Sequence, residues 1–227
     1  MRPIVLLGTG TNVGKTFVCS HLGAALRELF PSHPVLALKP VESGFPPLPK
    51  SSPDPASDAA LLATASTLLA PAPHPLYALP DPISPHLAAR RAGIGIDIPT
   101  IVDWVTSALH YNTLLLLETA GGALSPLSDT TTNLDLACAL EPAIWVLVAP
   151  DALGVLHDVR ATWTALHSLA RPPDHLVLTT AREPDPSTGT NARELGRLGF
   201  SSPTVLPRGD ARPLRSLAER LFRDAQS

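Results

Sequence analysis

This chain of 227 residues has few cysteines, no paired histidines, little excess charge and no long apolar run, and each of these scarcities argues against a class of protein. Its two cysteines, Cys19 and Cys138, lie far apart and lack metal-ligand spacing, which argues against a disulfide framework and a zinc site. We expect both to be small buried side chains in a reducing compartment. The eight histidines are scattered singly and form no HExxH pattern, so no histidine-based metal site is expected.

Charge of one sign and long apolar runs are also scarce. The formal net charge is −3 and no run of five basic residues occurs, so we expect no nucleic-acid or anionic-membrane partner. The apolar run Pro3–Leu7 is too short for a signal sequence or a membrane span. We therefore expect a cytoplasmic protein that does not insert into a membrane.

The length and the hydrophobic pattern predict one α/β domain over residues 1–227. Short, almost continuously apolar runs predict strands that are buried on both faces, at Ile4–Leu7, Val35–Leu38, Leu114–Leu117, Ile144–Val148, Leu176–Leu178 and Thr204–Leu206. Helical patterns lie between them, at Thr16–Phe30, Asp58–Leu69, Pro99–Leu109, Gly154–Leu169 and Pro213–Phe222. This alternation predicts a mostly parallel sheet with helices on both faces.

Proline is concentrated in one part of the chain. Eleven of the 26 prolines fall between Pro46 and Pro85. Because strand patterns continue on both sides, we interpret this stretch as a long loop interrupted by a helix rather than as a linker between domains.

A glycine-rich loop follows the first predicted strand and leads directly into a helix. Residues 8–16 read GTGTNVGKT, which departs from the strict P-loop pattern because Thr9 stands at the first glycine position. The run Gly14-Lys15-Thr16 remains, at a helix start whose free N–H groups favour phosphate. Lys15 is suited to the β- and γ-phosphates of a nucleotide, and the Thr16 hydroxyl is suited to Mg²⁺.

Two further strand ends carry charge. Lys39, which Pro40 follows, ends the second predicted strand and is a candidate for stabilising negative charge in a transition state. Glu118 ends the third and is placed to hold or orient Mg²⁺. Asp58 begins a predicted helix and is either a second metal carboxylate or the N-cap, since Ser57 and Asp58 both suit a cap.

In combination these segments resemble the dethiobiotin synthetase family. The resemblance covers about the first 170 residues and is carried by segments 8–16 (GTGTNVGKT), 39–44 (KPVESG), 57–59 (SDA), 77–86 (YALPDPISPH), 118–122 (ETAGG) and 126–129 (PLSD). A generic P-loop protein would share the first segment and little else.

The resemblance implies a single-domain P-loop fold and an ATP-dependent cyclo-ligase of biotin biosynthesis. Such an enzyme carboxylates one amine of 7,8-diaminononanoate to a carbamate. The γ-phosphoryl group of ATP then activates the carbamate as a mixed anhydride, and the second amine closes the ureido ring. ATP as co-substrate, Mg²⁺ as cofactor and a homodimer with active sites near the subunit interface are further implications.

The resemblance also implies a role for individual residues. Lys39 and Lys15 would be catalytic, and Thr16, Asp58 and Glu118 would hold Mg²⁺. Substrate would contact Thr11, Lys39 and Ser43, while the turn containing Gly154 and Val155 would seat its carboxylate from the opposing subunit. Nucleotide contacts would come from Asn12, Val13, Gly14, Lys15, Thr16, Phe17, Asp58, Glu118, Thr119, Ala120, Gly121, Pro207, Arg208 and Gly209.

The chain departs from the family pattern at a few positions. Gly10 and Asn12 stand where acidic residues are frequent, and Thr119 stands where glycine is usual. Residues 179–182 read TTAR where the family commonly reads adenine with an Asn-Asp pair. We therefore predict that several nucleoside triphosphates are accepted.

Other P-loop proteins are alternative interpretations. A switch ATPase of the partitioning type would carry an additional lysine at the position of Gly10. A cobyrinate-amidating ligase would need a glutaminase domain, for which 227 residues leave no room. A binding module that had lost catalysis would not be expected to keep its charged residues together, at Lys15, Thr16, Lys39, Asp58 and Glu118.

Overall fold

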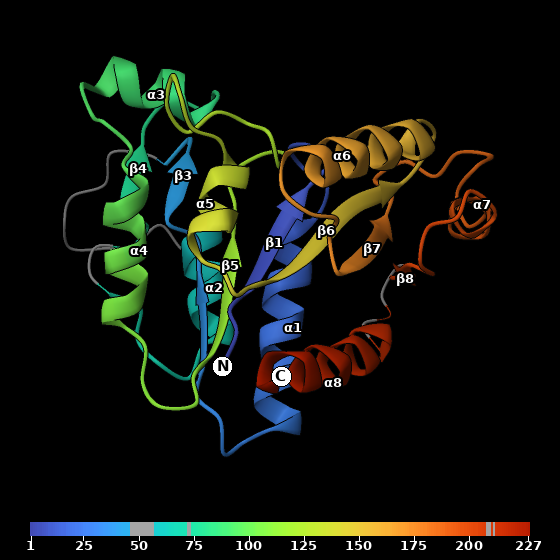
Figure 1. Ribbon diagram of the computed structural model, residues 1–227, viewed down its shortest axis with the longest axis horizontal. Coiled ribbons are helices and arrows are strands. Elements are labelled where there is room, and N and C mark those ends of the chain that lie inside the picture. Colours follow the sequence, from blue (N-terminus) through green and yellow to red (C-terminus); the bar gives the residue numbers. More distant parts are fainter. Residues whose placement is uncertain (46–56, 72–73, 208–209, 211) are drawn as a thin grey trace.

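Six parallel strands form the central sheet of the protein, seen in a computed structural model that describes residues 1–45, 57–71, 74–207, 210 and 212–227 (Figure 1). The strand order is β2-β5-β1-β6-β7-β8. The strands are β1 (Ile4–Gly8), β2 (Val35–Leu38), β5 (Leu114–Glu118), β6 (Ile144–Asp151), β7 (His175–Thr180) and β8 (Thr204–Val205). The predicted parallel α/β sheet is confirmed, because every pair of neighbouring strands is parallel.

Helices cover both faces of this sheet, as the apolar strands require. In β1, Ile4 and Leu6 belong to the core on one face, while Val5 and Leu7 belong to the core on the other. The first core is closed by α1 (Lys15–Leu29), α2 (Asp58–Ala65) and α8 (Arg212–Gln226). The second is closed by α3 (Pro85–Ala92), α4 (Ile98–Ser107), α5 (Asn133–Ala139), α6 (Val155–Leu169) and α7 (Asn191–Arg197).

A small second sheet lies beside the main one and was not predicted. It pairs β3 (Val41–Ser43) with β4 (Tyr77–Leu79) in parallel, and α3 packs against both strands, as Figure 1 shows at one side of the molecule. Each strand has three residues, which is too short for a clear apolar pattern. This sheet fixes the chain that follows Lys39.

Helix α2 ends at Ala65, four residues earlier than the predicted end at Leu69. The hydroxyls of Ser66 and Thr67 instead accept hydrogen bonds from backbone N–H groups of β2, at Ala37 (2.9 Å) and Val35 (2.8 Å). Side-chain hydroxyls compete in this way with helix continuation.

The two cysteines differ in their surroundings. Cys19 on α1 is buried, as predicted, but the prediction for Cys138 is wrong because that residue is exposed. Helix α5 turns Leu136 and Ala137 into the core and leaves Cys138 on its outer side. Among the described residues, no helix is both long enough and apolar enough to cross a membrane.

Candidate active site

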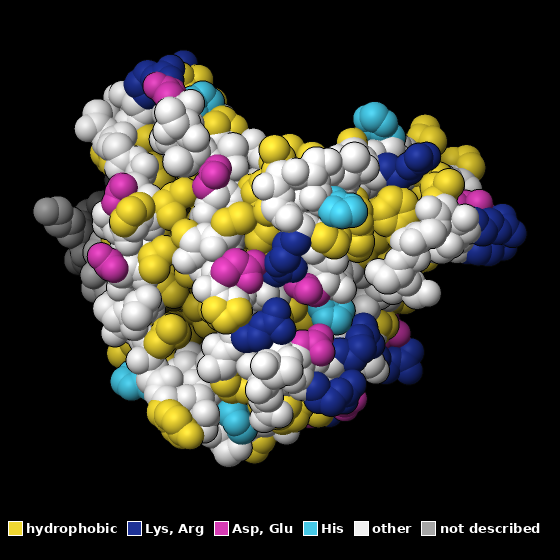
Figure 2. Space-filling view, viewed as in Figure 1, with side chains coloured by type: hydrophobic (Ala, Val, Ile, Leu, Met, Phe, Trp, Pro, Cys, Tyr) yellow, Lys and Arg dark blue, Asp and Glu magenta, His cyan; other side chains and the backbone are white. Residues whose placement is uncertain are grey.

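One cavity of about 1150 Å³ lies where the strands of the main sheet end. Figure 2 shows the surface dipping between the lobe that carries α3 and the part of the molecule that carries α6. Thirteen of the predicted site residues line the cavity: Thr11, Asn12, Gly14, Lys15, Thr16, Phe17, Lys39, Ser43, Asp58, Glu118, Ala120, Gly121 and Pro207. The loops after β1, β2 and β5 therefore meet at one place, as the topology of a parallel sheet requires.

The remaining predicted site residues do not line this cavity. Val13 and Thr119 are buried, and the Thr119 hydroxyl donates a hydrogen bond to the Leu6 carbonyl (2.9 Å). Gly154 and Val155 lie at the start of α6, outside the cavity wall. Arg208 and Gly209 lie outside the described residues.

The loop after β1 has the backbone of a phosphate-binding loop. Gly14 has φ +92°, and a Cβ there would lie 2.8 Å from the Thr179 side chain, so only glycine fits. The N–H of Val18 donates to the Gly14 carbonyl, which starts α1 immediately after this turn. The free N–H groups of the first turn of α1 are thus available to an anion.

Lys15 lies folded inside this loop. Its side chain is buried and Nζ donates to the Gly10 carbonyl (3.2 Å). Burial lowers the pKa of the Lys15 ammonium to about 8, although the Glu118 carboxylate acts in the opposite direction. A phosphate placed in the loop would restore a full charge partner to this group.

Lys39 forms ion pairs with two of the three acidic residues that line the cavity. Its Nζ lies 2.9 Å from Glu118 Oε1 and also contacts Asp58 Oδ2. Burial would lower the pKa of the Lys39 ammonium, but the charges of Glu118 and Asp58 outweigh that effect and raise it. Lys39 is therefore a fixed cation beside the phosphate loop. We call the set Lys15, Thr16, Lys39, Asp58 and Glu118 the phosphate-loop end of the cavity.

Ser57, and not Asp58, is the N-cap of α2. The Ser57 hydroxyl accepts from the Ala60 N–H (3.1 Å), which leaves the Asp58 carboxylate directed to Lys39. Glu42, which no sequence pattern singled out, is a buried carboxylate that accepts from the N–H groups of Asp58 (2.9 Å) and Ala59 (3.0 Å). Burial raises the pKa of the Glu42 carboxyl.

The phosphate-loop end has the donor set that Mg²⁺ requires. The Thr16 hydroxyl donates to Glu118 Oε1 (2.9 Å), and Glu118 Oε2 is buried with no hydrogen-bond partner among the described residues. Anionic and hydroxyl oxygens suit this hard cation. Within the described part of the chain, no three His, Cys, Asp or Glu side chains gather at one point. The residues therefore fit a Mg²⁺ that is shared with nucleotide phosphates rather than one fully enclosed by protein.

The opposite part of the cavity, which we call the β7 end, consists of Thr180, Arg182, Glu183 and Pro207. The Thr180 hydroxyl already donates to the Leu206 carbonyl (2.7 Å). Arg182 and Glu183 are exposed. The polar groups at this end are thus either engaged with the backbone or open to solvent.

Two further polar side chains support the cavity from behind, and sequence reasoning missed both. The buried Asn133 amide donates to the carbonyls of Ala120 (2.6 Å) and Gly122 (2.9 Å), which holds the loop after β5. His74 Nε2 accepts from the Lys39 N–H (3.3 Å), and burial lowers the pKa of this imidazole to about 4. A single polar residue, at a helix start in the case of Asn133 and in a loop in the case of His74, gives no local pattern that could reveal such a contact.

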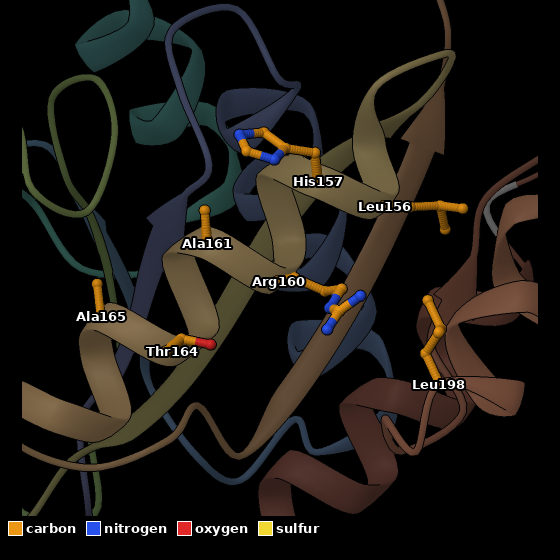
Figure 3. A pocket seen from close by; sticks show the side chains of 7 residues that line it. All are labelled: Leu156, His157, Arg160, Ala161, Thr164, Ala165 and Leu198. Atoms are coloured by element: carbon orange, nitrogen blue, oxygen red, sulfur yellow. The ribbon is translucent and has the colours of Figure 1, made fainter.

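A second, shallower hollow of about 700 Å³ lies along α6 and is separate from the cavity. Figure 3 shows Leu156 and Arg160 pointing from α6 toward the side on which Leu198 lies. Close to it, Leu153 is 83% exposed at the turn before α6. Among the residues that the structure describes, its lining includes one arginine but no glycine-rich loop or carboxylate, so it does not repeat the chemistry of the cavity.

Comparison with known proteins identifies the family. Residues 2–205 match a family model described as an AAA domain. The ATP-dependent dethiobiotin synthetase BioD of Caulobacter sp. (strain K31) is 34% identical over 98% of this chain and 95% of its own length. The chain belongs to the dethiobiotin synthetase family. Proteins of the same name from Methylobacterium nodulans (36% identical; 74% of this chain and 76% of that protein) and Anaeromyxobacter dehalogenans (34%; 91% and 89%) support the assignment.

Solved structures confirm the fold of this family member. A ParA family ATPase from Chlorobium tepidum has a TM-score of 0.54 and 14% identity, over 100% of this chain and 91% of the other. A MinC:MinD cell division protein complex from Aquifex aeolicus gives 0.55 and 14%, over 98% and 96%. At this identity the likeness establishes a shared P-loop architecture and nothing about activity.

Proposed function

We propose that this protein is an ATP-dependent dethiobiotin synthetase that makes the ureido ring from 7,8-diaminononanoate, CO₂ and ATP. The observation that carries the proposal is the second buried cation of the cavity, Lys39, beside the phosphate loop. Lys15 is placed to bind the outer phosphate of a nucleotide, so the Lys39 ammonium is available to interact with the group that accepts the phosphoryl. The family membership of the chain supports the same reaction.

The phosphate loop binds and orients the nucleotide in this proposal. The N–H groups around Gly14 and the ammonium of Lys15 meet the β- and γ-phosphates. Asn12, Val13, Thr16, Phe17, Thr119, Ala120 and Gly121 form the surrounding nucleotide site, with Pro207, Arg208 and Gly209 near the base. Because Lys15 is buried, an ion pair between its ammonium and a phosphate would be shielded from water and therefore stronger.

Lys39 acts on the reacting groups. One substrate amine combines with CO₂ and loses a proton to form a carbamate, whose oxygen attacks the γ-phosphorus as ADP leaves. The second amine then attacks the carbonyl carbon of the mixed anhydride, and phosphate leaves as the ring closes. Lys39 stabilises negative charge on the carbamate and on the transferring phosphoryl group, while Thr11 and Ser43 contact the diamine. Ser43 lines the cavity, and its buried hydroxyl has no hydrogen-bond partner among the described residues, which supports its contact with the diamine.

Thr16, Asp58 and Glu118 are proposed to hold Mg²⁺. Bound there, the ion would neutralise charge on the nucleotide phosphates. Glu118 Oε2 supports this assignment, since it has no hydrogen-bond donor in the described part of the chain and a buried carboxylate oxygen without a donor is otherwise unfavourable.

We propose a homodimer in which the turn before α6 seats the substrate carboxylate of the opposing subunit. Ala152 lines the cavity of its own subunit, whereas the exposed Gly154 does not, which supports a role of Gly154 toward a neighbour. The Val155 side chain is buried and its N–H donates to the Ala152 carbonyl (3.1 Å), so Val155 would support the turn. Leu153 is exposed at this turn. The hollow along α6 (Figure 3) offers an apolar surface that begins next to the turn. The whole chain, residues 1–227, is proposed to act as one domain in the cytoplasm.

The test measures phosphate release from ATP with diamine and bicarbonate together and with each omitted. Mass spectrometry of the product checks ring closure. We expect release to depend on both co-substrates and to fall strongly in Lys39→Ala. Release that ignored the diamine would support a switch ATPase of the partitioning type instead; the absence of a lysine at Gly10 argues against that alternative.

A further inference from the structure

Glu42 is a buried charged residue that lies next to the proposed chemistry without touching the cavity. It sits in the centre of β3, three residues after Lys39, and is 8% exposed. The small sheet fixes its backbone, because Glu42 is paired with Ala78 of β4. A buried carboxylate is unfavourable unless hydrogen bonds compensate it, so its partners indicate why it is there.

Both oxygens of Glu42 bind the start of α2. Oε1 accepts from the Asp58 N–H (2.9 Å) and Oε2 accepts from the Ala59 N–H (3.0 Å). The Ser57 hydroxyl accepts a hydrogen bond from the next backbone N–H, that of Ala60. The first three N–H groups of this helix are therefore satisfied by two side chains, one of which comes from a different element.

This arrangement fixes the residue that carries one of the proposed metal carboxylates. The Asp58 side chain is 36% exposed, and among the described residues its ion-pair partner is Lys39 alone, so its own packing restrains it weakly. Its backbone, in contrast, is held by Glu42 from the side of β3. A carboxylate is suited to this task because it has two acceptor atoms and carries the negative charge that a helix start favours.

We propose that Glu42 is a positioning residue for Asp58, which sets the affinity of the cavity for Mg²⁺ without contacting the metal or the nucleotide. The proposal rests on the proposed metal role of Asp58. It differs from simple helix capping in its consequence: loss of Glu42 would weaken metal binding more than it weakens nucleotide binding.

Glu42→Gln tests this difference, because glutamine keeps the shape and removes one acceptor and the charge. Isothermal titration with a non-hydrolysable ATP analogue is done with Mg²⁺ and again in a chelator, and the Mg²⁺ dependence of phosphate release is measured in parallel. We expect the apparent Mg²⁺ affinity to fall roughly 10–100-fold, as for outer-sphere supports of metal sites. Metal-free binding of the analogue should stay within about twofold, a change of roughly 0.4 kcal/mol.

Ser57→Ala is the matched control, since it removes a cap from the same helix but leaves the Asp58 N–H bound to Glu42. It should lower the melting temperature while Mg²⁺ affinity is unchanged. Glu42→Asp keeps the charge with a shorter arm and is used in the same assays if Glu42→Gln does not fold.

Asp58→Asn separates the two ways in which the inference could fail. If Asp58→Asn binds Mg²⁺ normally, the metal role of Asp58 is wrong and the inference falls with it. If Asp58→Asn loses Mg²⁺ affinity while the Glu42 variants keep it, the metal role stands and the positioning role of Glu42 is overturned.

Discussion

The phosphate-loop end and the β7 end of the cavity differ in what surrounds their polar groups. At the phosphate-loop end, Lys15, Lys39 and Glu118 are all buried, and ion pairs join Lys39 to the acidic residues. At the β7 end, Arg182 and Glu183 are exposed, and the Thr180 hydroxyl is bound to a backbone carbonyl. Buried charges in fixed positions discriminate strongly between ligands, whereas exposed ones do so weakly. We infer that selectivity is concentrated at the phosphates and metal.

The largest loss of activity is expected from removing an acidic group at the phosphate-loop end. Glu118→Gln should reduce kcat/KM roughly 10³-fold or more at sub-millimolar Mg²⁺, because the metal and Lys39 both lose an anionic partner. Asp58→Asn should cause a smaller but still severe loss. Circular dichroism checks that both variants fold. Near wild-type turnover at sub-millimolar Mg²⁺ would show that the mutated residue is not a metal ligand.

Removing the ammonium of Lys39 should cause the next largest loss of activity. Lys39→Ala is expected to lower kcat by roughly 10²–10³-fold, because a preorganised charge is lost from the transition state. Nucleotide affinity should change little, since Lys15 remains. Steady-state kinetics beside isothermal titration with a non-hydrolysable nucleotide separates the two effects. A large loss of affinity at unchanged kcat would make Lys39 a binding residue only.

His74 gives the phosphate-loop end a pH-dependent support. The folded protein holds this imidazole neutral down to about pH 4, whereas the unfolded chain takes up a proton near pH 6.5. The unfolded state therefore binds more protons between these values, and the free energy of unfolding falls as pH falls through that window. From pH 7 to pH 5 we expect His74 to account for a fall of at most about 2 kcal/mol.

Urea unfolding of the wild type and of His74→Gln at both pH values measures this contribution. The glutamine oxygen can still accept from the Lys39 N–H but does not titrate, so the variant should lose less stability between pH 7 and pH 5. An equal fall in the two proteins would place the titration elsewhere.

The smallest effect is expected at the β7 end. With saturating diamine and bicarbonate, kcat/KM for ATP, GTP and CTP should lie within about tenfold of one another, a difference of roughly 1.4 kcal/mol. The reason is that a threonine bound to the backbone and an exposed arginine read a base edge poorly. A preference for ATP above about a hundredfold, or ~2.7 kcal/mol, would reveal an adenine-reading group and remove the contrast between the two ends.

Sequence could predict the parts of this molecule that follow from local pattern. The main strands are continuous apolar runs, and the Gly14-Lys15-Thr16 run marks a strand–loop–helix junction, so both were predictable. The convergence of Lys39 and Glu118 followed from topology, since ends of parallel strands share one edge of the sheet.

The parts that could not be predicted depend on contacts between distant segments. Glu42 meets the start of α2 across 16 positions of sequence, and Asn133 reaches back 13 positions to Ala120. The strands β3 and β4 are stable because they pair with each other and with α3, and no residue pattern within three positions reports this. Cys138 was predicted to be buried on its residue type alone, and the orientation of α5 decided otherwise.

The early end of α2 has a consequence for the solubility of the protein. Strand β2 is an outer strand of the main sheet, and an outer strand with free N–H and C=O groups is a template on which another chain can add a strand. Here the hydroxyls of Ser66 and Thr67 accept hydrogen bonds from the outward-facing N–H groups of Ala37 and Val35. The Thr67 N–H donates to the Val35 carbonyl (2.8 Å). The segment after α2 thereby satisfies hydrogen-bonding groups of β2 that would otherwise be available for aggregation through strand addition.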